Sequence, residues 1–219
     1  MKIFQIGAGG NVGRRLTQLL TSRGDTVSGM HRAPDQADAI REAGATPVSG
    51  DLIDTSVDEL ANLMNGHDAV VFSAGAHGTG RDKTTLIDGK GLEKAAAAAR
   101  QAGARRFILV SAFPESERGG ELGDDFEHYM RVKKTADVYL TRTDLDWVIV
   151  RPGLLRDDLG TGLVTAGPAV EYGSVSRDNV AAFIAATLHE PALSRQIVEL
   201  TDGDQPVDQV VAQLAAARP

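Results

Sequence analysis

The feature that most constrains the fold is the amino-terminal run MKIFQIGAGGNVG, in which a short apolar strand leads directly into a glycine-rich turn. Gly7, Gly10 and Gly13 recur every third residue, Gly9 adds a fourth glycine, and an apolar helix pattern starts at Val12. Such a turn can hold a dinucleotide pyrophosphate, because glycine lets the backbone approach phosphate and the first helical N–H groups face the anion. A plain glycine turn between a strand and a helix is the alternative interpretation.

Strand and helix patterns alternate over the first two thirds of the chain. We expect strands at 2–7, 26–30, 45–49, 68–73, 105–111 and 146–151, and helices at 11–23, 34–43, 56–65, 82–102 and 126–142. Uninterrupted apolar strands separated by helices are typical of a parallel sheet that is covered on both faces. Because parallel crossovers are right-handed, the sequence predicts an α/β, Rossmann-like, doubly wound sheet with ligands at the carboxyl ends of its strands.

The regular alternation of strand and helix patterns ends after Pro152. Two short strands are expected at 162–166 and 170–175, followed by a helix at 177–189, a strand at 195–200 and a helix at 206–217. We interpret residues 1–219 as a single domain in which residues 152–219 contribute a small substrate cap. The acidic, glycine-rich segment 114–125 follows the carboxyl end of a strand, so we expect a mobile loop placed like a lid.

Composition excludes several classes of protein. The net charge of −7 argues against a general affinity for nucleic acid. The chain has no cysteine, and its five histidines show no metal-binding spacing, so we expect no metal site. No apolar run approaches the roughly 18 to 20 residues that span a bilayer. We therefore expect a cytoplasmic monomer or homodimer that acts on a small-molecule substrate and has no nucleic-acid or membrane partner.

The ends of the second, third and fourth strands indicate which dinucleotide the turn would hold. The second strand ends at Arg32 without the carboxylate that suits NAD, and a guanidinium there suits a 2′-phosphate. This favours NADP(H) over NAD(H), although a solvated arginine is the alternative. Asp51 and Leu52 could contact adenine, but Asp51 could equally be a capping or turn residue. The small residues Ser73-Ala74-Gly75 would let the backbone pass close to the ribose.

Tyr129 and Lys133 are four residues apart in a predicted helix and therefore share one face. A nearby ammonium favours the phenolate and moves the tyrosine pKa from about 10 toward neutrality. Such a phenol suits proton transfer to or from a carbonyl or alcohol oxygen. A pair with this spacing also arises by chance. Ser111 at the end of the fifth strand strengthens the interpretation, because its hydroxyl could orient a substrate oxygen.

Together these residues resemble the short-chain dehydrogenase/reductase superfamily, and specifically its atypical branch of small NAD(P)H-binding, NmrA-like proteins. The resemblance covers the whole chain, and its most recognisable segment is Tyr129–Gly153. It implies that Ser111, Tyr129 and Lys133 are catalytic and that Lys133 also holds the nicotinamide ribose. It implies cofactor contacts from the glycine turn, the strand ends and the backbone near the nicotinamide, namely Gly7, Gly9, Gly10, Asn11, Val12, Gly13, Arg32, Asp51, Leu52, Ser73, Ala74, Gly75, Lys133, Pro152 and Gly153.

From this resemblance we expect an NADPH-dependent oxidoreductase that reduces a small carbonyl, quinone or flavin-type acceptor by hydride transfer. Tyr129 would donate the proton to a carbonyl oxygen, whereas hydride transfer to a flavin or quinone needs no such acid. The alternative is an NADP(H)-binding redox sensor without turnover that signals through the 114–125 loop. An isomerase or epimerase with tightly held NAD is a third hypothesis, which Arg32 disfavours.

Overall fold

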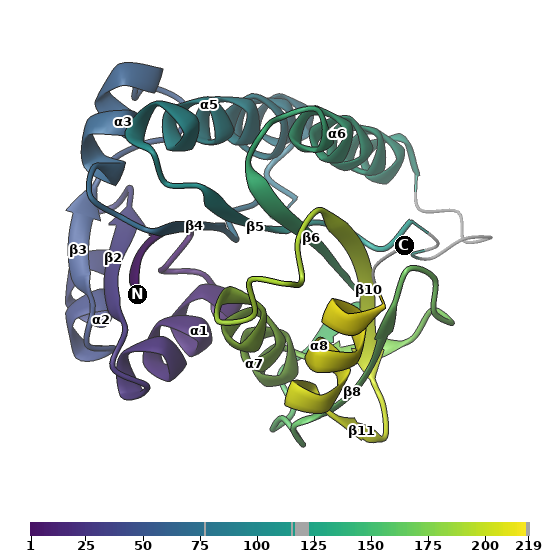
Figure 1. Cartoon of the computed structure of the whole chain (residues 1–219). Helices are drawn as coiled ribbons and strands as arrows, with labels where there is room; N and C mark the ends of the chain where they lie inside the picture. The colour runs from purple at the N-terminus through teal and green to yellow at the C-terminus, as the bar shows by residue number, and fades with distance from the viewer. Residues whose placement is uncertain (77, 115, 117–122, 218–219) are drawn as a thin grey trace.

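The apolar strands form the middle of a nine-stranded sheet with the order β11-β8-β10-β6-β5-β4-β1-β2-β3. The computed structural model describes residues 1–76, 78–114, 116 and 123–217 (Figure 1). The strands predicted in the first two thirds of the chain are β1 Lys2–Ile6, β2 Thr26–His31, β3 Thr46–Ser49, β4 Ala69–Phe72, β5 Arg106–Val110 and β6 Asp146–Pro152. Each pairs in parallel with its neighbours. The predicted doubly wound, Rossmann-like fold is therefore confirmed.

Helices cover both faces of this sheet, as Figure 1 shows. One face carries α1 Asn11–Ser22, α2 Gln36–Glu42, α7 Arg177–Leu188 and α8 Val207–Ala216, and the other carries α3 Val57–Met64, α5 Leu92–Ala102 and α6 Gly123–Thr141. The side chains between the sheet and each helical layer form a separate hydrophobic core. The central strands lie between the two cores, which explains why β4, with the sequence AVVF, is buried at every position.

The predicted helix over 82–102 is interrupted by a π-helical segment. Its parts are α4 Arg81–Thr84, the π-helix η1 Thr85–Gly91, and α5. The wider turns of η1 contain the buried Asp88, which accepts a hydrogen bond from the backbone N–H of Ala76 at 3.0 Å. A π-helical segment inside a helix is frequent at functional sites. The apolar periodicity that predicted one helix does not distinguish this variant.

Residues after Pro152 extend the sheet instead of standing apart from it. β10 Gln196–Asp202 pairs in parallel with β6, and β8 Leu163–Gly167 and β11 Gln205–Pro206 add antiparallel strands. The strand expected at 170–175 is limited to β9 Ser174–Ser176, which pairs with the unpredicted β7 Leu154–Arg156 in a second, two-stranded sheet. Runs of three residues are too short to show an alternating pattern.

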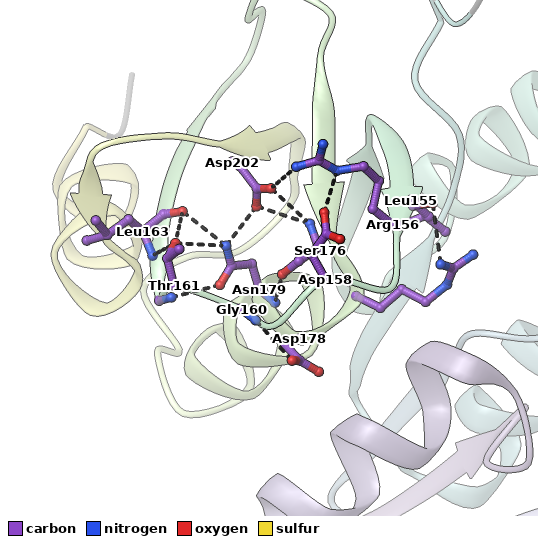
Figure 2. A network of polar contacts seen from close by, with 12 residues as sticks. Leu155, Arg156, Asp158, Gly160, Thr161, Leu163, Ser176, Asp178, Asn179 and Asp202 are labelled. Carbon is purple, nitrogen blue, oxygen red and sulfur yellow. Dashed lines mark hydrogen bonds and ion pairs between the residues drawn. The ribbon is translucent and has the colours of Figure 1, made fainter.

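A partly buried polar network ties these carboxyl-terminal pieces together (Figure 2). The amide nitrogen of Asn179 donates to Asp202 Oδ1 at 2.7 Å, and its amide oxygen accepts from the backbone N–H of Gly162 at 2.9 Å. Ser176 caps α7 by accepting from the backbone N–H of Asn179. The network therefore joins the start of α7 to the end of β10 and to the loop before β8.

The expected lid at 114–125 lies largely outside the described residues, which omit 115 and 117–122. Its last part belongs to α6, which starts at Gly123, three residues before the predicted start. There Arg81 pairs with Asp124 and Asp125. None of the helices in the described part of the chain combines the length and the hydrophobicity needed to cross a membrane.

Candidate functional site

The glycine turn between β1 and α1 forms a cradle of backbone atoms. Gly7 has a φ of +90°, and a Cβ at this position would lie 2.6 Å from the backbone nitrogen of Ala74. Gly10 donates its N–H to Gly7 O at 3.0 Å and is the N-cap of α1, where no side chain caps the helix. The N–H groups in the first turn of α1 are therefore available to an anion, as a pyrophosphate requires.

Two other glycines of the turn have different surroundings. A Cβ on Gly13 would lie 2.1 Å from Gly7 O, so Gly13 allows α1 to pack against the turn. Gly13 does not line either of the cavities described below. A Cβ on Gly9 would meet the side chain of Gln36 at 3.0 Å. Gln36 was not anticipated from the sequence, because the residue lies outside the motif.

A cavity of about 480 Å³ extends from the turn across the carboxyl ends of β1, β2, β3 and β4. The predicted cofactor residues that line it are Gly7, Gly9, Gly10, Asn11, Arg32, Asp51, Leu52, Ser73, Ala74 and Gly75. The guanidinium of Arg32 is exposed and has no partner among the described residues. Gln36 Oε1 accepts from the backbone N–H groups of Arg32 and Ala33 at 3.3 and 3.2 Å, which orders the loop that carries the arginine.

Asp51 has the local role of a turn aspartate and also lines this cavity. Its Oδ1 accepts from the backbone N–H of Ile53 at 2.8 Å. The ammonium of Lys94, on α5, donates to the carbonyl oxygens of Leu52 at 2.8 Å, Ile53 at 3.0 Å and Thr55 at 2.5 Å. A lysine has three donor hydrogens, so this side chain is fully used in holding the loop after β3.

A second cavity, of about 510 Å³, adjoins the first. The two share the residues Gly10, Asn11, Ser73, Ala74, Gly75 and Ala76. The second cavity brings together the predicted Val12, Ser111, Tyr129 and Lys133. It is also lined by Thr84, Asp88 and Phe126, which the sequence did not indicate as site residues, and by Leu155 and Arg177. The last two lie after Pro152, so the carboxyl-terminal part supplies one wall of this cavity.

Lys133 is buried and held in place by two groups. Its ammonium donates to the carbonyl oxygen of Val110 at 3.1 Å and lies 3.6 Å from Asp88 Oδ1. Asp88 uses its other oxygen to accept from the backbone N–H of Ala76. One carboxylate from the π-helix thus joins the predicted catalytic lysine to the loop after β4.

The expected shift of the Tyr129 pKa toward neutrality is wrong for this structure. Burial raises the pKa of the Tyr129 phenol, and the carboxylates of Asp88 and Asp137 raise it further, while Lys133 acts in the opposite direction. Lys133 is the expected stabiliser of the phenolate, but burial and the two carboxylates oppose its effect on the pKa of Tyr129. The phenol is therefore protonated at neutral pH, which is the form that can donate a proton.

Ser111 and Asp137 form a buried hydrogen bond beneath the second cavity. Ser111 Oγ donates to Asp137 Oδ1 at 2.6 Å, and Arg151 binds Asp137 Oδ2 through Nη2 at 2.9 Å and Nε at 3.0 Å. Burial raises the pKa of the Asp137 carboxyl, although the bond from Ser111 and the charge of Arg151 oppose this shift. The spacing of Asp137, one helical turn after Lys133, could have indicated it.

Pro152 and Gly153 do not line either cavity. A Cβ on Gly153 would lie 2.1 Å from the carbonyl oxygen of Gly173, so the glycine allows two backbone segments to pass closely. The structure therefore gives Gly153 a packing role. The predicted contact of both residues with the nicotinamide end stays a prediction.

Comparison with known proteins identifies the family. A family model described as NAD(P)H-binding matches residues 7–191. The chain is 39% identical over 216 residues to the uncharacterized sugar epimerase YhfK of Bacillus subtilis (strain 168). This alignment covers 98% of this chain and 100% of the relative. The chain belongs to the NAD(P)H-binding family, and the predicted resemblance is confirmed.

Solved structures agree with this assignment. A protein from Bacillus halodurans described as an NAD-dependent epimerase/dehydratase superposes with a TM-score of 0.89 and 34% identity, over 97% of this chain and 99% of that one. ChuY, an anaerobillin reductase from Escherichia coli O157:H7, gives a TM-score of 0.77 and 26% identity, over 93% of this chain and 98% of that one.

Proposed function

We propose that this protein is an NADPH-dependent oxidoreductase that reduces a small carbonyl, quinone or flavin-type acceptor by hydride transfer. The observation that carries the proposal is that the two cavities adjoin and share six lining residues. The first contains the glycine turn at the uncapped start of α1 and the exposed side chain of Arg32, and the second contains Tyr129 and Lys133. The reductase activity in the name of ChuY supports the same reaction class.

The residues of the first cavity fit an adenine dinucleotide phosphate. The open first turn of α1 would hold the pyrophosphate, Arg32 would bind the 2′-phosphate, and the loop at Asp51 and Leu52 would contact the adenine. When bound, the reduced nicotinamide supplies a hydride, which delivers two electrons to the acceptor. Ser73, Ala74 and Gly75 would allow the ribose to pass close to the backbone, and Val12 would lie toward the nicotinamide.

The residues of the second cavity would handle the substrate and its proton. Tyr129 would protonate the oxygen of a reduced carbonyl and regain its proton from solvent, because its raised pKa keeps it protonated. Lys133, held by Asp88, would contact the nicotinamide ribose. We further propose that the chain is one domain and that residues 152–219 form the substrate side, with Leu155 and Arg177 lining it.

The test is the oxidation of NADPH in the presence of aldehydes, ketones, quinones and flavins, with wild-type protein and Tyr129→Phe. If a carbonyl is the acceptor, Tyr129→Phe should lower kcat by roughly 100-fold or more and leave the Kd for NADPH unchanged. Unchanged turnover would instead indicate direct hydride transfer to a flavin or quinone. Phe126→Leu, on the same helix and in the same cavity, controls for altered packing.

A redox sensor without turnover is the second candidate function. It is supported by the engagement of Lys133 with Asp88 and of Ser111 with Asp137, which leaves fewer groups for acid–base chemistry. Cofactor binding without acceptor-dependent oxidation across the whole panel would favour the sensor. An epimerase, the activity named for the Bacillus subtilis relative, predicts NAD that stays bound through purification.

A further inference from the structure

The direction of the hydrogen bond from Ser111 determines what this side chain can offer to a substrate. Ser111 lies just after β5, lines the second cavity, and directs its hydroxyl to Asp137 Oδ1 at 2.6 Å. A serine hydroxyl has one proton and two lone pairs. Since the proton is used on Asp137, the lone pairs remain, and Ser111 faces the cavity as a hydrogen-bond acceptor.

Arg151 keeps Asp137 in this role. Its guanidinium has donors but no acceptor, stays charged, and occupies the second carboxylate oxygen at 2.9 and 3.0 Å. Asp137 is buried, so rotation of the Ser111 hydroxyl toward the cavity would leave a buried carboxylate oxygen without its donor. Arg151 and Asp137 therefore disfavour the orientation in which the Ser111 hydroxyl donates to a substrate carbonyl oxygen. Orienting a substrate oxygen is the role that the sequence led us to expect for Ser111.

Tyr129 offers the opposite polarity in the same cavity. Its hydroxyl has no hydrogen-bond partner among the described residues, and its neutral phenol can donate a proton. A cavity with one hydrogen-bond donor, Tyr129, and one acceptor, Ser111, complements the edge of a ring in which a carbonyl group is adjacent to an N–H group. A ketone or an aldehyde supplies an acceptor for Tyr129 but nothing for the lone pairs of Ser111.

We propose that Asp137 is a positioning residue that holds Ser111 as an acceptor, so that the cavity selects hydride acceptors with a lactam or imide edge, such as an isoalloxazine ring. This inference rests on the proposed function and narrows its acceptor class from three chemical types to one. Asp137 itself binds Ser111 and Arg151 and does not line the second cavity.

The test compares lumiflavin with 3-methyllumiflavin, which lacks the ring N–H. For the wild-type protein, kcat/KM with NADPH should be roughly five- to tenfold higher for lumiflavin, as one hydrogen bond would give. In Ser111→Ala this ratio should fall to about one, because the acceptor is removed. Equal values for the two flavins in the wild type, or an unchanged ratio in Ser111→Ala, would overturn the inference.

Asp137→Asn tests the positioning role. An amide no longer restricts the Ser111 proton, so the preference for lumiflavin should shrink, whereas Thr135→Ala on the exposed side of the same helix should keep it. A ratio of two substrates on one variant is insensitive to loss of folded protein. An unchanged ratio in Asp137→Asn would exclude this role for Asp137.

The inference and the proposed function can fail separately. If neither flavin is reduced, the two are compared as ligands of the NADP⁺-loaded protein by calorimetry. Weaker binding of 3-methyllumiflavin that disappears in Ser111→Ala would support the inference, and equal binding or no binding would overturn it. NADPH oxidation with none of the acceptors would refute the reductase function and leave the inference to be decided by these affinities.

Discussion

The first and the second cavity, which are the two halves of the candidate site, are built in different ways. The first cavity is formed largely by backbone and small residues at the ends of consecutive strands, beginning with the glycine turn. The second is lined by the buried Asp88 and Lys133, and behind Ser111 lie the buried Asp137 and the partly buried Arg151, so that charged side chains from η1, α6 and β6 support it. A backbone-lined site depends on the local course of the chain, whereas a network of buried charges depends on how distant elements pack.

This difference affects what each half tolerates. In the first cavity, the critical property is the absence of side-chain atoms in the glycine turn, so an added branched side chain would occupy the space needed by the ligand. In the second, removal of one partner leaves another buried group without a hydrogen bond or counter-ion. We therefore expect substitutions to affect cofactor affinity in the first half, and proton transfer and acceptor choice in the second.

The largest expected effect is in the glycine turn. Gly10→Val should weaken NADPH binding by about 100-fold or more, because a branched side chain at the N-cap of α1 would occupy the space of the pyrophosphate. Calorimetry gives the Kd, and circular dichroism checks that the variant is folded. Gly10→Ala, whose Cβ would lie 3.2 Å from Gly7 O, should lose less affinity. Wild-type affinity in the valine variant would contradict a phosphate site at this turn.

Arg32→Ala should discriminate between the two nicotinamide cofactors. Loss of the free guanidinium should weaken NADPH by roughly 10- to 100-fold and leave NADH nearly unchanged, because the 2′-phosphate is the difference between them. Both affinities are measured by calorimetry. Arg41→Ala, which removes an exposed arginine paired with Asp38 on α2, is the matched control. Equal losses for NADPH and NADH would exclude a 2′-phosphate contact.

If a carbonyl compound from the acceptor panel is reduced, the pH dependence of that reaction reports on the second cavity. Tyr129 must be protonated to act as an acid, and burial raises its pKa above 10.0. The rate should therefore stay level from neutral pH to about pH 10 and decline only above it, as the phenol ionises. Steady-state kcat across this range measures the effect. A decline that begins between pH 7 and 8 would mean that Lys133 outweighs burial and the two carboxylates.

The smallest expected effect concerns the loop after β3. Lys94→Met removes the ammonium that binds three carbonyl oxygens and should weaken NADPH and 2′,5′-ADP equally, by roughly 3- to 10-fold. The value of kcat should not change, because the second cavity is untouched. Lys90→Met, in which an exposed lysine paired with Glu93 is lost, is the control. A lower kcat with normal affinity would place Lys94 outside the adenosine side.

The sequence by itself determined the six parallel strands β1 to β6, the glycine turn and the identity of the residues that follow each of these strands. These are local properties, because a buried parallel strand must be apolar along its length and a phosphate turn needs glycine at fixed spacing. Only the tertiary structure decided that Asp88 meets Lys133 and that Asp137 holds Ser111. Those pairs join residues from 26 to 45 positions apart, and their hydrogen-bond directions depend on which side chains share a buried space. For the same reason the pKa of Tyr129 moved upward, since burial and two carboxylates together outweigh the one lysine that the spacing revealed.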